Sequence, residues 1–201
     1  MRERMAQDSV TSAPLLAARL RGGEPALIPT DTLPALAATP EHAQQLWALK
    51  RRPADKPLIL MGADLEPLQE ALGLAWRQEW LAMASVAWPG ALTLVLPARG
   101  PAVESLNPGA TSLGLRIPAC AVTRELLRLS GPLATTSANV SGSPAATTAA
   151  AAAACFPGVP LLGPLPWPEA GGLASTVLAW SDSGAWQVLR AGAYLPPGLT
   201  P

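Results

Sequence analysis

The chain has 201 residues, and its 14 basic and 14 acidic side chains leave no formal net charge. A chain of this length can bury the core of one domain, and its neutral balance excludes a global field as the source of any affinity for anions. One histidine and two separate cysteines leave too few soft ligands for a zinc site, so we expect no protein-bound metal.

Two further patterns exclude classes of protein. No apolar segment reaches about eighteen residues, and the N-terminus lacks the apolar stretch of a signal peptide. The sequence therefore predicts a soluble, cytoplasmic protein that makes no membrane contact and keeps its cysteines reduced. The seven tryptophans are scattered rather than interleaved with basic residues, so we expect them in the core or at its rim rather than in a base-stacking platform.

Hydrophobic periodicity and the positions of proline and glycine predict helices and strands that alternate along the chain. In chain order, the expected elements are a helix over 13–20, a strand over 26–29, a helix over 40–50, a strand over 58–61, helices over 65–72 and 76–86, strands over 92–96 and 112–117, a helix over 122–129, a strand from 133, a helix over 148–156, and strands over 175–180 and 186–190. Stretches 97–108 and 157–172 are expected to be irregular. The alternation predicts an α/β fold without a separate second domain.

Small polar residues mark the expected starts of three helices. Ser12, Thr39 and either Thr147 or Thr148 can cap the helices that follow them. The last of these helices contains the alanine run 149–154, for which a low-complexity linker is the alternative.

Residues 49–57, Leu-Lys-Arg-Arg-Pro-Ala-Asp-Lys-Pro, concentrate positive charge at the end of the expected helix 40–50. This basic segment contains both lysines of the chain, and Pro53 and Pro57 disfavour helix for the residues before them. We expect a stiff, extended turn whose fixed cations can bind phosphate or carboxylate at little ordering cost. A solvated surface cluster is the alternative.

Three other segments place polar side chains in or next to apolar strands. Residues 30–32, Thr-Asp-Thr, follow a strand at a position where ligand sites of open α/β sheets collect. Arg116 shares a strand face with Ser112 and Gly114, and it needs either an internal ion pair or a ligand. Residues 135–142 offer hydroxyl, amide and backbone N–H groups to an anion, although such residues also form ordinary turns.

Six short blocks occur together: Pro29-Thr30-Asp31-Thr32, Lys50-Arg51-Arg52-Pro53-Ala54-Asp55-Lys56-Pro57-Leu58, Trp88-Pro89-Gly90-Ala91-Leu92-Thr93, Leu115-Arg116-Ile117-Pro118, Thr136-Ser137-Ala138-Asn139-Val140-Ser141-Gly142, and Ser175-Thr176-Val177 with Leu189-Arg190-Ala191-Gly192. In this order they resemble the YrdC-like family of threonylcarbamoyl-adenylate synthases. The resemblance implies a single domain over 12–192, with an N-terminal extension over 1–11 and a proline-rich tail over 193–201. Its fold would be an open, twisted, mixed α/β sheet with flanking helices and a concave, positively charged cavity.

The resemblance also implies an activity. L-threonine, bicarbonate and ATP would form L-threonylcarbamoyl-adenylate and pyrophosphate, for threonylcarbamoylation of adenosine 37 of tRNA by separate tRNA-threonylcarbamoyl transferase proteins. Magnesium would accompany ATP. Carbamate attack on the α-phosphorus develops negative charge that fixed arginine and lysine can stabilise without a protein nucleophile.

Site residues follow from the same resemblance, position by position. The threonine-binding residues would be Thr32, Arg116, Thr135 and Ser175. The ATP-binding residues would be Arg52, Lys56, Ser112, Ser137 and Arg190. The catalytic residues would be Lys50, Arg52, Ser137 and Asn139.

The chain departs from the family pattern at three places. Residues 33–37 read Leu-Pro-Ala-Leu-Ala where the family usually has Val-Tyr-Gly-Leu-Gly, Met61 replaces a frequent histidine, and Ala145 replaces a frequent serine. Loss of the aromatic ring at Pro34 predicts a more open pocket and weaker threonine binding. Two alternatives are a catalytically silent paralogue that binds RNA through the basic cavity, and a domain that uses another carbamoyl donor, as in hydrogenase maturation proteins.

Overall fold

The structure, a computed structural model, describes residues 10–53 and 56–200. Its strands are β1 Val10–Thr11, β2 Ala26–Ile28, β3 Ala35–Ala38, β4 Ile59–Met61, β5 Leu92–Pro97, β6 Ser112–Arg116, β7 Leu133–Ser137, β8 Leu161–Leu162, β9 Thr176–Trp180 and β10 Trp186–Arg190. The expected N-terminal extension before Val10, Ala54 and Asp55 of the basic segment, and the last residue of the tail lie outside the described residues.

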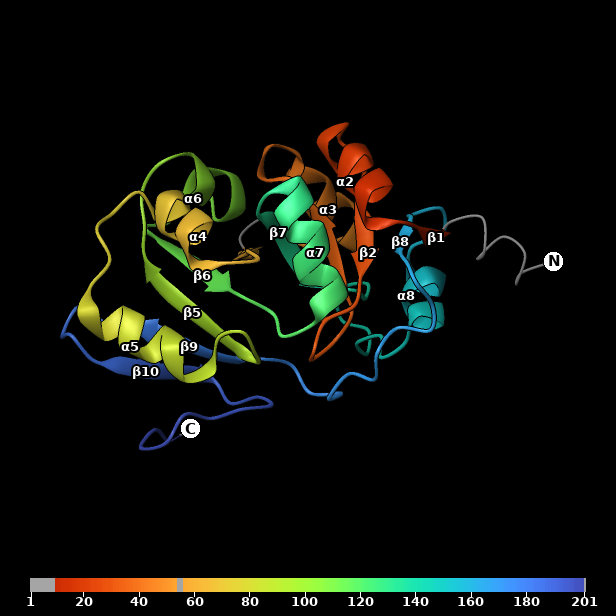
Figure 1. Ribbon diagram of the computed structural model, residues 1–201. Helices are drawn as coiled ribbons and strands as arrows, with labels where there is room; N and C mark the ends of the chain where they lie inside the picture. The colour runs from red at the N-terminus through yellow and green to blue at the C-terminus, as the bar shows by residue number, and fades with distance from the viewer. Residues whose placement is uncertain (1–9, 54–55, 201) are drawn as a thin grey trace.

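The described strands form one sheet in the order β1-β8-β2-β3-β7-β4-β6-β5-β9-β10 (Figure 1). Strand β4 pairs with β6 in parallel and with β7 antiparallel, and β5 pairs with β9 in parallel and with β6 antiparallel. The predicted mixed α/β sheet is therefore confirmed. The nonsequential order means that strands far apart in the chain lie side by side.

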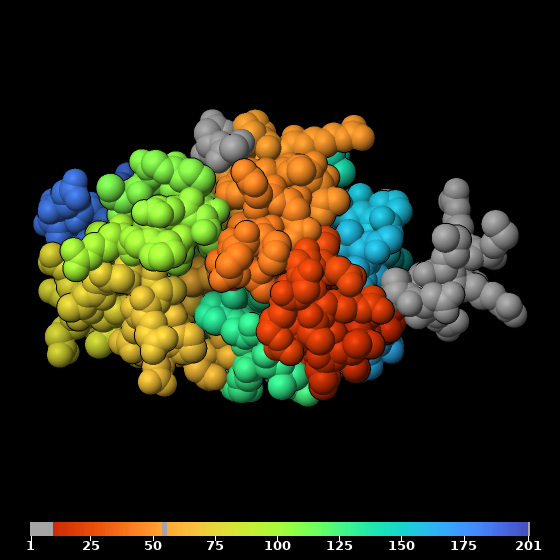
Figure 2. Space-filling model, turned by 90° about the horizontal axis from the view of Figure 1, so that it is seen from above, coloured from red at the N-terminus to blue at the C-terminus, as the bar shows by residue number. Residues whose placement is uncertain are grey.

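The helices are α2 Ala13–Arg21, the 3-10 helix η1 Pro40–His42, α3 Gln44–Lys50, α4 Leu65–Leu72, α5 Gln78–Ala87, α6 Pro101–Leu106, α7 Ala121–Ser130 and α8 Ala149–Cys155. Helices α3, α4, α5, α6 and α8 contribute to the larger core, into which Leu36 and Leu60 project from the sheet. Seen from above, the segment that contains η1 (orange) lies between α6 (green) and α2 (red) (Figure 2). None of the described helices is long and apolar enough to cross a membrane.

Helices α2 and α7 pack on the opposite face of the sheet. Their core includes Ala35 and Ala37 of β3 and Met61 of β4, but no residue of β5, β6 or β9. Side chains alternate between faces along a strand, and register pairs Met61 with Arg116. Arg116 therefore projects from the part of this face that α2 and α7 leave uncovered, as the strand period predicts.

Several elements of the structure differ from those that the sequence predicts. Residues 35–38 form β3 rather than a loop, because β2 and β7 hydrogen-bond to it on both sides and so override the low strand propensity of alanine. The expected loop 97–108 contains α6, which begins with Pro101 at the first helical position and buries Val103 and Leu106 at helical spacing. The short strands β1 and β8 were also missed, and β8 lies inside the stretch that we expected to be irregular.

The helix starts agree only in part with the predicted caps. Thr148 caps α8, because its Oγ1 accepts a hydrogen bond of 3.1 Å from Ala151 N. Ser12 and Thr39 make no side-chain cap, and Thr39 Oγ1 instead lies 2.9 Å from His42 Nδ1. The expected helix 40–50 is divided into η1 and α3.

The tryptophans pack as the sequence predicts. Trp76, Trp80, Trp180 and Trp186 form a chain of edge-to-face contacts with ring centroids 5.0–6.3 Å apart. These ring contacts link α5 to β9 and β10, so they stabilise the edge of the sheet that carries β10.

Candidate active site

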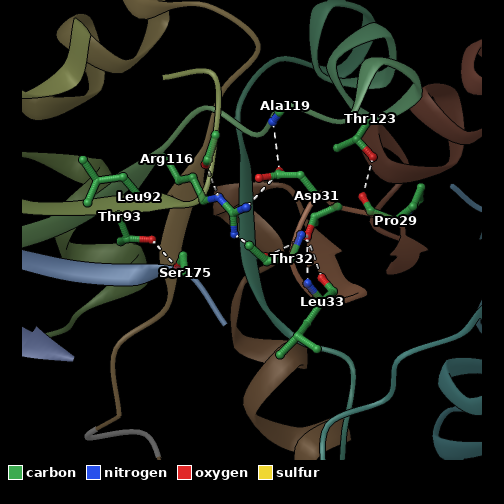
Figure 3. Close-up of polar contacts among 12 residues, drawn as sticks. Pro29, Asp31, Thr32, Leu33, Leu92, Thr93, Arg116, Ala119, Thr123 and Ser175 are labelled. Carbon is green, nitrogen blue, oxygen red and sulfur yellow. Dashed lines mark hydrogen bonds and ion pairs between the residues drawn. The ribbon is translucent and has the colours of Figure 1, made fainter. Parts of the chain in front are cut away.

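The loop between β2 and β3 reaches the side chain of Arg116 at the end of β6 (Figure 3). The hydroxyl of Thr30 holds this turn, since it accepts hydrogen bonds of 3.1 Å from the N–H groups of Thr32 and Leu33 and donates one of 2.7 Å to the carbonyl of Leu33. This turn presents Asp31 and Thr32 to the side chain of Arg116. Residues that are 84 and 85 positions apart in the chain thus meet.

Arg116 is 4% exposed and is held from three sides. Its Nε donates to Gly90 O at 3.0 Å, Nη1 donates to Thr32 Oγ1 at 2.8 Å, and Nη2 donates to Asp31 Oδ1 at 2.8 Å. Ala119 N also donates to Asp31 Oδ1, at 2.9 Å. The internal ion pair is therefore present, but these contacts use three of the five N–H groups of a guanidinium. Two donors remain for a ligand.

A second arginine increases the positive potential at this point. Arg190 donates from Nε and Nη2 to the carbonyl of Ser175 at 3.1 and 2.8 Å. The hydroxyl of Ser175 lies 2.9 Å from that of Thr93, and both residues are buried. Burial lowers the pKa of Arg116, Asp31 opposes this shift, and the charge of Arg190 lowers the pKa further. An anion between the two guanidinium groups would relieve their repulsion.

A second polar cluster lies at the end of β7. Ser137 Oγ donates to Asn139 Oδ1 at 2.6 Å, and Asn139 Nδ2 donates to Ser143 O at 2.7 Å. Arg52 donates from Nη1 to Thr136 Oγ1 at 3.3 Å and from Nη2 to Pro57 O at 3.0 Å. The end of the basic segment thus joins the end of β7.

The two lysines differ in exposure. Lys50 is 1% exposed, and its Nζ donates to the carbonyls of Ser137 and Asn139. Lys56 is exposed, and its carbonyl accepts a hydrogen bond from Trp47 Nε1 at 2.9 Å. The expectation of fixed cations holds for Lys50 and Arg52, whereas Lys56 is exposed and Arg51 ends α3 in a left-handed conformation with φ of 51°. A solvated surface cluster does not describe Lys50.

The floor between the two clusters is formed by β4, β6 and β7. Thr135 pairs with Ile59, which pairs with Gly114, so these residues share the face of the sheet that carries Arg116. Ser112 stands at the start of the same strand. A Cβ at Gly114 would lie 2.9 Å from Ile59 Cγ2, so glycine avoids a steric clash with Ile59 at this point of the sheet. Of the predicted site residues, Ser112, Arg116 and Thr135 thus share one face of the sheet, whereas Arg52 contacts Thr136, whose pairing partner Leu36 projects into the larger core on the other face.

Two cavities border other parts of the molecule. A cavity of about 470 Å³ lies beside the loop between β2 and β3, and Pro34, Trp167 and Thr148 line it. A larger one, of about 1120 Å³, lies at α4 and α6 and includes Leu60, which projects from the opposite face of the sheet. Because the larger cavity contains none of the predicted site residues, size alone does not identify the site.

Sequence reasoning gave no binding or catalytic role to Asp31, Thr93 or Gly90. Asp31 was noted only as one of three oxygen-bearing side chains after a strand, yet its carboxylate is the charge partner of Arg116. An acid between two threonines in that position was the available signal. Thr93 and Gly90 lie in the block over residues 88–93, but their contacts depend on strand pairing that a single sequence does not reveal.

The chain is similar to known proteins in sequence and in fold. The model of the Sua5/YciO/YrdC family, described as "Telomere recombination", matches residues 18–192. Threonylcarbamoyl-AMP synthase of Bacillus subtilis (strain 168) is 36% identical over 138 residues, which are 66% of this chain and 40% of the relative. The enzyme of that name from Stenotrophomonas maltophilia is 38% identical over 135 residues, 64% of this chain and 72% of the relative. The chain thus spans less than half of the length of the Bacillus protein.

Solved structures show the same fold. Sua5 of Pyrococcus abyssi, crystallised with L-threonine, is 32% identical with a TM-score of 0.82, over 90% of this chain and 54% of that one. YciO of Escherichia coli has a TM-score of 0.75 over 90% of this chain and 88% of that one, and at 21% identity it shows the fold alone.

Proposed function

Because the chain belongs to the Sua5/YciO/YrdC family, we propose that it makes L-threonylcarbamoyl-adenylate from L-threonine, bicarbonate and ATP, with release of pyrophosphate. The observation that carries the proposal is the buried guanidinium of Arg116, which Asp31 and Thr32 orient and which keeps two donors. Such a fork is suited to bidentate binding of a carboxylate. The complex of Pyrococcus abyssi Sua5 with L-threonine supports an amino acid as that ligand.

In this proposal, threonine lies on the uncovered face with its carboxylate at Arg116. Thr32, Thr135 and Ser175 surround it with hydroxyl groups that can hydrogen-bond to its amine and hydroxyl. Thr135 and Ser175 are buried, so the floor orients the ligand and excludes water from one side. The threonine amine would attack the carbon of bicarbonate, and loss of water would leave a carbamate.

The nucleotide would lie between the end of β7 and Arg190. Its phosphates would be near Arg52, Ser137 and Asn139, and Lys56 and Ser112, the other predicted ATP residues, would contact the nucleotide from the same side. A carbamate oxygen would attack the α-phosphorus, and the bond from that phosphorus to the pyrophosphate oxygen would break. Arg52 and Arg190 would stabilise the negative charge that develops on the phosphate oxygens.

Magnesium would enter as part of the Mg–ATP substrate. No group of three histidine, cysteine or acidic side chains that could hold a metal occurs among the described residues. Asp31 is the carboxylate of the site, and it is already occupied by Arg116 and Ala119. We therefore assign no protein ligand to the metal. The product would pass to separate transferase proteins that modify adenosine 37 of tRNA.

The test is pyrophosphate release by the purified full chain with Mg–ATP. We expect release that requires both L-threonine and bicarbonate, and a higher threonine requirement in Arg116→Lys, which keeps the charge but loses the fork. Arg128→Lys is the matched control, because Arg128 pairs with Asp64 away from the site. Pyrophosphate release that does not depend on L-threonine would contradict the proposal. A silent RNA-binding paralogue has less support, because Lys50 and Arg116 are buried and do not present their charges to a polyanion.

A further inference from the structure

Lys50 ends helix α3 with its side chain turned into the protein, although a lysine at a helix end usually extends into solvent. Its Nζ has an acceptor for each of its three hydrogens: the carbonyls of Ser137 and Asn139, and Asn139 Oδ1 at 3.3 Å. The carbonyl of Lys50 in turn accepts a hydrogen bond of 3.0 Å from Ser141 N. Main chain and side chain of one residue therefore hold the loop over 137–141.

These contacts decide which groups of the loop face outward. The carbonyls of Ser137 and Asn139 both accept from the ammonium ion, which compensates their negative ends. Asn139 Oδ1 accepts from both Lys50 Nζ and Ser137 Oγ, so the same ammonium ion fixes the two polar side chains of the loop. Since all the hydrogens of Nζ are bound within the protein, Lys50 does not have a donor left for a substrate.

We propose that Lys50 is a positioning residue whose ammonium ion holds the 137–141 loop in the shape that binds the phosphates of ATP, so that loss of one proton from Lys50 weakens ATP binding. The inference rests on the proposed function and describes how ATP binding at the same site depends on the charge of Lys50. It changes the role that the family resemblance implies for Lys50, from a group that touches substrate to one that acts through Ser137 and Asn139.

The surroundings of Lys50 place its titration within reach of experiment. Burial, followed by the charge of Arg52, lowers the pKa of Lys50 from 10.5 to about 8, and Cys155 of α8 opposes this shift. A neutral amine has two hydrogens for three oxygens, and its lone pair would face one of them. Bound phosphate would favour the ammonium form, so ATP should raise the pKa of Lys50.

The chain offers a direct measurement because Lys50 and Lys56 are its two lysines. In the full chain labelled with carbon-13 at lysine Cε, two resonances titrate, and Lys56→Arg identifies which belongs to Lys50. We expect the resonance of Lys50 to titrate near pH 8. Saturating Mg–ATP should move the Lys50 titration upward.

Calorimetric measurement of the Mg–ATP affinity at a series of pH values tests whether the protonation of Lys50 affects binding. Affinity should fall by up to about tenfold per pH unit above the pKa of Lys50, since one proton is linked to binding. Lys50→Arg stays charged and should lose this dependence. If that variant does not fold, the comparison of NMR and calorimetric titrations in the parent still decides. An ATP affinity independent of pH through the Lys50 titration would overturn the inference, and binding without turnover would contradict only the proposed function.

Discussion

Replacement of Asp31 by asparagine tests the electrostatic design of the site. The amide keeps Oδ1 as an acceptor for Arg116 Nη2 and Ala119 N, so the substitution removes charge and little else. Breaking a buried ion pair costs about 3–5 kcal/mol because an uncompensated charge is left behind. Asp31 is 18% exposed and Arg116 keeps its bonds to Gly90 and Thr32, so we expect a smaller loss, about 2–3 kcal/mol in the free energy of unfolding.

Urea denaturation of both proteins at neutral pH measures this loss. The matched control is Asp64→Asn, since Asp64 is 51% exposed and pairs with Arg124 and Arg128 on the surface, where such pairs contribute about 0–1 kcal/mol. L-threonine should stabilise Asp31→Asn more than the parent, because the carboxylate of the ligand would compensate the charge that the substitution leaves unpaired on the guanidinium of Arg116. Equal losses in the two asparagine variants would refute the reasoning.

Three further predictions concern single contacts. Thr148→Ala should reduce the free energy of unfolding by about 1 kcal/mol through loss of the helix cap, whereas Thr147→Ala should leave it within about 0.5 kcal/mol, and urea denaturation separates them. Arg52→Ala should weaken binding of an ATP analogue by about 1.5–3 kcal/mol in calorimetry with threonine present, and an unchanged affinity would remove Arg52 from the site. Arg116→Lys should weaken threonine binding more than ATP binding, and the reverse order would place Arg116 at the nucleotide.

Two features that a local pattern decides were predicted correctly from the sequence. The two-residue strand period placed Arg116 on the face of Ser112 and Gly114, and register confirms it. The cap at Thr148 was one of two predicted alternatives, and the structure selects it. Both features depend on neighbours within a few positions, which a single sequence contains.

Features that depend on distant partners were missed or misjudged. Residues Ala35–Ala38 read as a loop, because their strand exists only between β2 and a strand about a hundred residues later in the chain. Lys50 belongs to a charge run that usually indicates an exposed surface, but its acceptors are 87 and 89 residues away. The ion pair between Asp31 and Arg116 forms only because the loop between β2 and β3 folds toward β6. Such contacts follow from tertiary structure rather than from propensity.

The central claim, that one surface joins threonine, bicarbonate and ATP, is tested most directly by isotope incorporation. The purified full chain is incubated with carbon-13 bicarbonate, L-threonine and Mg–ATP, and the adenylate product is analysed by mass spectrometry. The account predicts threonylcarbamoyl-adenylate that carries one carbon-13 atom from bicarbonate and is lost in Arg116→Ala. A product without the label, or no adenylate under conditions in which the Bacillus subtilis synthase forms it, would contradict the account.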